Sequence, residues 1–458
     1  MKRINYHALQ AFRVSCLFIA FFSCTKEIDQ PAVSAAEEFS KKPNDPGFAS
    51  NDMVMYWNER TAVIFGVAVI QPTRARRFAI TQIAVHDALN NIKPKYERFA
   101  LNQREQFADP DAAVASAAHR AITGLGRGNA QVDYWRDSCL AAIPDGESKT
   151  LGIALGIKSA NAILANRAND GFTQVLVTSP NPPDGDEPGE YRSTLRFVTV
   201  NGVPTLVPFE VKNIPNWGTV LRPFVVESNS QFRPSGPYAV NSVAYTADYD
   251  EVKQKGANQG GVRAANEETL ARFWSENRPS IIWNNFARNI IAGKKMDAWK
   301  TARLFALMHT AMADGINTVM NSNYHFYSWR PETAVRLAGT DGNASTSPDA
   351  NWLPFLAEAP GAFYTPPVPQ YPSSFGMYGG VATGVLQSFF GSDDISIELN
   401  SFALPGTTLH YSSIAQAARD NSVSKIWSGW DFRKAVIDGE EMGMRIGRYV
   451  FNNHFREQ

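Results

Sequence analysis

Cysteine and histidine are scarce in this chain. Its 458 residues include three Cys and seven His, and no CxxC or HExxH pair occurs. These counts and spacings argue against a zinc site. Lys plus Arg and Asp plus Glu both number 44, so no excess charge of one sign would attract nucleic acid. We therefore expect no structural metal ion and no nucleic-acid partner, and any anion site must be local.

An apolar run near the N-terminus is short and ends at a cysteine. Basic residues precede the apolar run Val14–Ser23, a pattern typical of a signal peptide, and the run is too short to span a membrane as a mature helix. The sequence FFSC ending at Cys24 resembles a bacterial lipobox, although Phe21 replaces the usual Leu. We expect residues 1–24 to be a lipoprotein signal peptide and Cys24 to carry lipid. Ordinary secretion with cleavage elsewhere, or a retained anchor, is the alternative.

We interpret the mature chain as a tether followed by one domain. Residues 25–51 are rich in Lys, Glu, Pro, Ser and Ala without periodicity, which suits a flexible tether. Residues 52–458 contain no long polar linker, and we interpret them as one domain. After cleavage, with Cys24 lipidated, Cys139 would be the one free thiol, so no intramolecular disulfide can form. The expected location is the bacterial cell envelope, on the outer membrane or the periplasmic face, with the membrane contacted through the lipid anchor.

Helical periodicity dominates the domain and predicts an all-α fold, a helical bundle with one loop-and-hairpin excursion. Predicted helices cover residues 72–91, 110–122, 130–143, 148–169, 242–255, 266–276, 281–291, a long segment after Asp297, 374–390 and 438–452. Gly315 on the long segment indicates a close helix contact. The excursion lies between residues 173 and 236, where two β-rich runs flank Asn201-Gly202, a hairpin signal.

Three separated stretches carry the chemically informative residues. They are NYHFYSWRPETAVR at residues 323–336, PQYPSSFGMYGG at 369–380 and SKIWSGWDFRKAVIDG at 424–439. Their order and spacing resemble the KxxxxxxRP, PSGH and SRxxxxxHxxxD motifs of vanadium-dependent haloperoxidases and the type 2 phosphatidic acid phosphatase superfamily. Similarity beyond these motifs covers most of the mature chain. The resemblance implies a helical bundle and a site for a tetrahedral oxyanion.

In that family, a Lys, two Arg, a Ser hydroxyl and a backbone N–H hold the oxyanion, as charge-assisted donors do. One His ligates vanadium or attacks phosphorus, and a second His transfers protons. By the resemblance, three positions here keep the oxyanion donors: Arg330 matches the first Arg, Ser373 matches the hydroxyl donor, and Ser374 stands where a Gly supplies its N–H.

The remaining motif positions depart from the family. Asn323 stands in place of the Lys, Lys425 in place of the second Arg, and Phe375 in place of the acid–base His. Asp431 stands in place of the nucleophilic or vanadium-binding His, and Ala435 in place of the Asp that orients it. Asn323 removes a positive charge and Asp431 adds a negative charge, and both changes weaken anion binding. Phe375 cannot transfer a proton, so the catalytic positions Asp431 and Phe375 are both altered.

His86 lies on an apolar helical face and is expected to be a hydrogen-bonded core residue rather than a ligand. His325 and His410 are the candidates for a replacement proton donor. His325 sits in an aromatic cluster, where we expect packing rather than proton transfer. His410 precedes the last helices on a predicted loop, and the sequence does not place it relative to the site.

Several functions stay open on this sequence. The first is a binding or scaffolding lipoprotein, in which Arg330 and Asp431 form a buried ion pair in a vestigial oxyanion pocket. The second is a phosphoric-ester hydrolase with Asp431 as nucleophile, or a weak vanadium-dependent haloperoxidase. The resemblance names vanadate as the cofactor to test, and phosphate or a phosphate ester as small-molecule ligands. Family members often associate, so a homodimer is a further expectation.

Overall fold

The computed structural model describes residues 51–66, 70–173, 184–200, 203–208, 217–275, 278–359, 362–363 and 365–458. The predicted signal peptide, Cys24 and nearly all of the predicted tether lie outside these ranges, as does the predicted Asn201-Gly202 turn. Within the described ranges, no helix combines the length and the hydropathy needed to cross a membrane.

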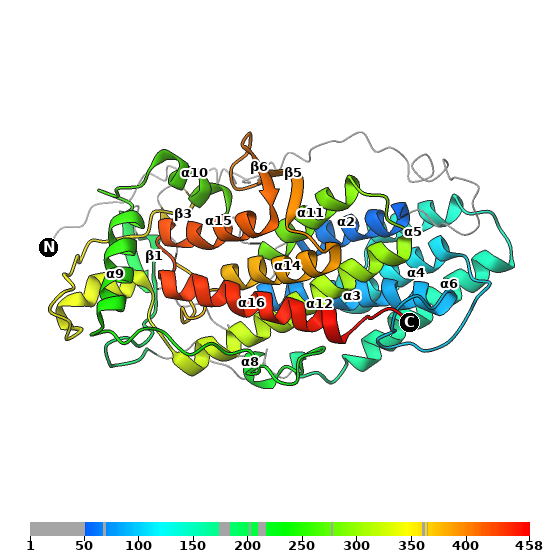
Figure 1. The fold of residues 1–458 in the computed structure, drawn as a ribbon, viewed down its shortest axis with the longest axis horizontal. Coiled ribbons are helices and arrows are strands. Elements are labelled where there is room, and N and C mark those ends of the chain that lie inside the picture. The colour runs from blue at the N-terminus through cyan, green and yellow to red at the C-terminus, as the bar shows by residue number, and fades with distance from the viewer. Residues whose placement is uncertain are drawn as a thin grey trace, which may run out of the picture.

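Most of the long helices run along the long axis of the molecule (Figure 1). The first half of the chain forms α2 (Asp52–Gly66), α3 (Gln71–Ile92), α4 (Pro110–Ile122), a π-helical turn (Thr123–Arg127), α5 (Ala130–Ala141) and α6 (Glu147–Asn166). The excursion then forms the antiparallel pair β1 (Leu195–Val200) and β2 (Val203–Pro208), followed by the short α8 (Trp217–Val220). The predicted hairpin strands are therefore confirmed.

The second half of the chain adds most of the remaining bundle. Its helices are α9 (Val243–Lys255), α10 (Ala265–Phe273), α11 (Pro279–Ala292), α12 (Ala298–Phe326), α13 (Pro331–Leu337), α14 (Ser374–Phe390), α15 (Ile414–Trp427) and α16 (Arg433–Asn453), with a 3-10 turn at Ala338–Thr340. Two short antiparallel pairs accompany them, β3 (Ala357–Ala359) with β4 (Ala362–Phe363), and β5 (Asp394–Asn400) with β6 (Thr408–Ser413). The all-α class with a hairpin excursion is confirmed.

The long helix α12 is the centre of the core. Asp297 caps its N-terminus by accepting a hydrogen bond from the backbone N–H of Lys300 at 2.8 Å. Nearly every residue from Ala298 to Met320 is buried, and α12 packs against α3, α14 and α16. A helix with apolar residues all round must lie inside a bundle, so α12 provides the frame on which the other site-bearing helices are placed.

Glycine allows α12, α14 and α16 to approach closely. A Cβ at Gly315 would collide with the side chain of Met377 on α14, which confirms the predicted close contact. Cβ atoms at Gly380 and Gly443 would collide with backbone atoms of the facing helix, at Glu440 and Met377 respectively. Small residues let helix backbones touch, so the ends of α14 and α16 that bear site residues are held close to each other.

Two buried carboxylates fasten loops to the bundle. Asp87 on α3 accepts three successive backbone N–H groups of residues 99–101 at 2.6 to 3.0 Å, and Asp314 on α12 accepts those of residues 224–226 at 2.6 to 3.0 Å. Burial raises the pKa of both to about 6, against the lowering effect of these N–H donors. His86 bonds the backbone oxygen of Glu97 at 2.9 Å and is fully buried, which confirms it as a core residue.

Several predicted boundaries were wrong. The helix predicted at 438–452 begins at Arg433, the one predicted at 266–276 covers Ala265–Phe273, and the one predicted to end near 169–171 ends at Asn166. Helices α2, α13 and α15 and the β5–β6 hairpin were not predicted. Helix α15 was missed because buried polar residues interrupt its apolar pattern, among them Asn421, Ser424 and Lys425.

Candidate active-site region

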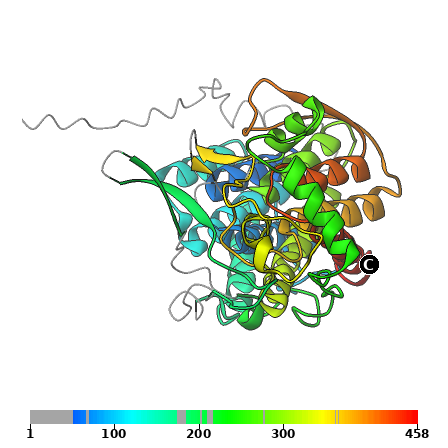
Figure 2. The same ribbon diagram turned by 90° about the vertical axis from the view of Figure 1, so that its left-hand side faces the viewer.

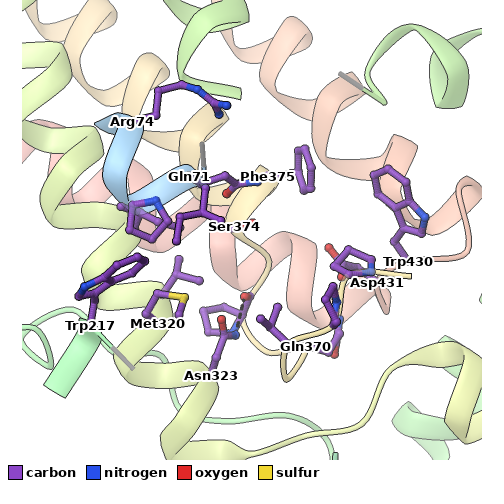
Figure 3. Close-up of a pocket in the computed structure, with 18 of the residues that line it drawn as sticks. Gln71, Arg74, Trp217, Met320, Asn323, Gln370, Ser374, Phe375, Trp430 and Asp431 are labelled. Atoms are coloured by element: carbon purple, nitrogen blue, oxygen red, sulfur yellow. Dashed lines mark hydrogen bonds between the residues drawn. The ribbon is translucent and has the colours of Figure 1, made fainter. Parts of the chain in front are cut away.

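The three motif stretches meet beside the C-terminal part of α12 (Figure 3). Asn323 lies near the end of α12, Arg330 is the N-cap residue of α13, and Ser373 is the N-cap residue of α14. Asp431 lies in the turn between α15 and α16. Pro331 at the first position of α13 suits a helix start, because it needs no N–H donor and has a fixed φ. Helix termini therefore bring the polar side chains together.

The Asp431 carboxylate accepts hydrogen bonds from two of the predicted oxyanion donors. The guanidinium Nη1 of Arg330 lies 2.7 Å from Oδ1 of Asp431, and the hydroxyl of Ser373 donates to Oδ2 at 2.6 Å. Arg330 and Asp431 are 5% and 3% exposed, so the predicted buried ion pair is present. Arg330 also donates to the backbone oxygens of Val368 at 2.8 Å and Trp430 at 3.1 Å. Asp431 thus binds two of the side chains that the family resemblance predicts as oxyanion donors.

The N-terminus of α14 forms the floor beside this ion pair. Ser373 receives a hydrogen bond at its hydroxyl from the backbone N–H of Gly376 at 3.3 Å, and its own N–H donates to the oxygen of Ala435 at 3.0 Å. Ser374 is the first residue of α14, where the helix dipole favours negative charge. Asn323 donates to the backbone oxygen of Pro372 at 3.2 Å, so its amide contacts the loop before α14.

Phe375 separates Lys425 from this network. The Phe375 ring lies 5.8 Å from the Trp430 ring, and the Lys425 ammonium lies 4.3 Å from the Phe375 centroid and 5.5 Å from that of Trp430. The ammonium also donates to the backbone oxygen of Trp274. Burial lowers the pKa of Lys425 to about 7, while the charge of Asp431 acts in the opposite direction. Lys425 is therefore held by rings and a carbonyl, as an ammonium over aromatic faces is.

Comparison with known proteins finds similarity to vanadium haloperoxidases. The family model for the VCPO second helical-bundle domain matches residues 303–457. A vanadium chloroperoxidase of Curvularia inaequalis is 23% identical over 420 residues, which cover 76% of this chain and 67% of that protein. The family model and this relative both support a relationship to the haloperoxidase-like superfamily.

Solved structures of bacterial vanadium-dependent enzymes share the fold of this haloperoxidase-like chain. The first bacterial vanadium-dependent iodoperoxidase matches with a TM-score of 0.75 and 21% identity, over 91% of this chain and 99% of that one. A holo-type bacterial vanadium-dependent chloroperoxidase matches with a TM-score of 0.63 and 17% identity, over 89% of this chain and 98% of that one. At these identities the similarity concerns the fold.

A cavity of about 720 Å³ adjoins the network in this haloperoxidase-like chain (Figure 3). Asn323, Arg330, Ser374, Phe375 and Asp431 line it, as do Gly66, Ile70, Gln71, Pro72, Arg74, Trp217, Arg278, Ile316, Val319, Met320, Pro366, Pro367, Val368, Gln370, Pro372 and Trp430. Its walls are mainly apolar, and its volume is in the range of sites for drug-sized ligands. The ion pair therefore leaves a sizeable hollow next to it.

The structure sorts the predicted site residues into two groups. Asn323, Arg330, Ser374, Phe375 and Asp431 line the cavity, and Ser373 bonds Asp431 directly behind it. Lys425 does not line this cavity: it lies behind the rings of Phe375 and Trp430.

Sequence reasoning missed other residues that line the cavity. Gln71 and Arg74 come from α3, and Trp217 comes from the excursion. Their local sequence contains no motif signal, and only tertiary packing places them there.

The candidate histidines lie elsewhere. His325 is exposed near the end of α12, with its ring 4.8 Å from that of Phe326. His410 lies on strand β6 rather than on a loop, and its Nδ1 is 3.5 Å from a carboxylate oxygen of Glu398 on the neighbouring strand. Neither lines the 720 Å³ cavity. Among the residues in the described ranges, no cluster of His, Cys, Asp and Glu is arranged to hold a metal ion.

Proposed function

We propose that this chain is an exported, lipid-anchored member of the haloperoxidase-like superfamily that binds a ligand or partner and has lost oxyanion catalysis. The observation that carries the proposal is the bonding of Asp431 to both Arg330 and Ser373. A carboxylate supplied by the protein takes the place of the oxyanion, which neutralises Arg330 without a ligand. The 720 Å³ cavity beside it supplies the space for binding.

Electrostatics supports the loss of anion binding. An oxyanion placed about 4 Å from Asp431 would meet a repulsion of roughly 4 kcal/mol per pair of unit charges at an effective dielectric near 20. Arg330 is already committed to the carboxylate and two backbone oxygens. The residues present do not fit vanadate, because no His stands at the position that would ligate it and Asp431 carries negative charge there.

The chemistry of acid–base catalysis gives a second argument. Phe375 fills the position of the family's proton-transferring His, and general acid–base help is worth about 100-fold to 10,000-fold in rate. The hydrolase alternative requires Asp431 to attack phosphorus. One oxygen of that carboxylate accepts a hydrogen bond from Arg330 and the other accepts one from Ser373. The leaving group would also lack a proton donor at the Phe375 position.

Calorimetry with orthovanadate tests the proposal directly. We expect residues 25–458 to give no binding heat at millimolar orthovanadate or phosphate, and neither phosphatase activity nor bromide oxidation. Arg330→Ala tests whether any heat comes from this site, and Arg336→Ala, a change of the same type on α13, serves as matched control. Micromolar binding that disappears only in Arg330→Ala, or turnover that depends on Asp431, would contradict the proposal.

The anchor and the location are tested separately. We expect the full-length protein to incorporate labelled fatty acid and to sediment with membranes, and Cys24→Ala to lose both properties because the thiol is the acylation site. Cys139→Ala is the matched control, since that thiol is fully buried. Equal membrane association of wild type and Cys24→Ala would exclude the lipid anchor. Light scattering on the soluble chain tests the expected homodimer.

A further inference from the structure

A second cavity of about 370 Å³ lies apart from the Asp431 network. It is enclosed by α9, by the start of α16 and by the loops that precede α9, α13 and α14. Helix α9 crosses the end of the molecule that faces the viewer in Figure 2. Gln370 is the one residue common to the linings of the two cavities. The second cavity is therefore a separate space with its own chemistry.

Five of its fourteen lining residues are aromatic. Tyr245, Trp329, Tyr371 and Phe432 are buried, whereas Tyr238 is 40% exposed and marks the mouth. The Tyr245 ring centroid lies 6.5 Å from that of Trp329 and 5.6 Å from that of Phe432. Aromatic faces carry negative potential and attract cations.

A carboxylate lies among these rings. Asp248 on α9 is 8% exposed and accepts a hydrogen bond from the backbone N–H of Lys434 at 2.8 Å. It forms no ion pair with a residue of the described ranges. Lys434 also lines this cavity, and its ammonium bonds Asp438 at 2.7 Å and lies 5.3 Å from the Tyr238 ring. Burial raises the pKa of Asp248. The charges of Arg433 and Lys434 act favourably on Asp248, but Arg433 pairs with Glu251 and Lys434 with Asp438, so these groups leave one carboxylate in excess. A cation in the cavity would balance that charge.

We propose that this second cavity binds a small organic cation, an alkylammonium group that pairs with Asp248 and packs against the faces of Tyr245, Trp329 and Phe432. Gln370 lines both cavities, and its buried Nε2 has no hydrogen-bond partner among the described residues, so it is available as a donor to a ligand. An oxygen on the same ligand fits that donor. The cavity volume, near 370 Å³, has room for a molecule of the size of choline and for larger alkylammonium compounds. This site goes beyond the proposed function and does not depend on it.

Calorimetry on the mature chain with choline chloride tests the site. Dimethylbutanol, the uncharged carbon isostere of choline, has nearly the same shape and separates charge recognition from apolar fit. Asp248→Asn removes the charge but keeps an oxygen that can accept the Lys434 N–H. Asp250→Asn on the exposed side of α9 is the matched control. Tyr238→Ala at the mouth is a second variant that leaves the buried rings intact.

We expect choline to bind with millimolar affinity or better, and Asp248→Asn to weaken binding roughly tenfold or more, the order expected when a partly buried charge pair is lost. Tyr238→Ala should weaken it less, and Asp250→Asn should leave it unchanged. The proposal is overturned if choline does not bind at about 50 mM, if dimethylbutanol binds as well as choline, or if Asp248→Asn binds like wild type. Binding of glucose instead of choline would also overturn it. None of these outcomes bears on vanadate binding at Asp431.

Discussion

Replacing Asp431 with Asn should reopen the oxyanion site. The change keeps the size of the side chain and the acceptor for Ser373, but it removes the charge that Arg330 contacts at 2.7 Å. Breaking a buried ion pair by removing one partner costs about 3 to 5 kcal/mol, and we expect about 3 kcal/mol here because Arg330 keeps its bonds to Val368 and Trp430. Removal of roughly 4 kcal/mol of repulsion corresponds to about 1,000-fold tighter oxyanion binding.

The assay combines stability and binding. Urea unfolding of the variant without anion should show the loss of stability, and phosphate or orthovanadate should restore it in proportion to the logarithm of its concentration. At 100 times the dissociation constant, the gain is about 2.7 kcal/mol. Wild type should show no such gain, because its own carboxylate already occupies Arg330 and Ser373. The double variant with Arg330→Ala should lose the anion response.

Two results would refute this reasoning. If Asp431→Asn is as stable as wild type, the ion pair at 2.7 Å does not hold the site together. If the variant is destabilised but neither anion stabilises it, Arg330 and Ser373 do not form a latent oxyanion site, and the resemblance to the family does not extend to binding at these positions.

Three further predictions concern stability. Burial lowers the pKa of His309 to about 3, so below about pH 6.5 the unfolded chain binds a proton that the folded chain does not, and folding stability falls with the pH. The variant His309→Gln should lose less stability on acidification, by up to about 1.4 kcal/mol per pH unit. Equal differences in urea midpoint between wild type and variant at pH 7 and pH 5 would refute this. Burial lowers the pKa of Lys425 to about 7, so between about pH 7 and 10.5 the unfolded state binds more protons than the folded state. In denaturant titrations, the unfolding free energy of wild type should therefore rise with pH relative to that of Lys425→Met. A difference between the two proteins that does not change with pH would exclude a strongly buried ammonium. Gly443→Ala should lower stability by about 2 kcal/mol in thermal unfolding, because its Cβ would collide with the backbone of Met377, whereas Gly293→Ala, whose Cβ meets nothing closer than 3.8 Å, should stay near wild type.

The sequence predicted the elements with regular patterns. The helices predicted after Asp297 and from residue 374 begin where helical periodicity placed them, and the β1–β2 strands lie where the hairpin signal placed them. Helix α15 was missed for a physical reason: Ser424 and Lys425 are buried in it, so apolar periodicity gives no signal. Tertiary contacts supply partners for such residues, as Trp274 does for Lys425.

For the site, the resemblance of three sequence stretches to family motifs singled out Arg330, Ser373 and Asp431, because residues can be matched to motif positions one by one. Where those groups point was decided by the tertiary structure. Only packing brings the termini of α13 and α14 against the turn before α16, so that a carboxylate meets a guanidinium at 2.7 Å and Lys425 lies behind Phe375. The two cavities, too, are formed by segments distant in the chain, since empty space is a property of packed surfaces and leaves no local pattern in a sequence.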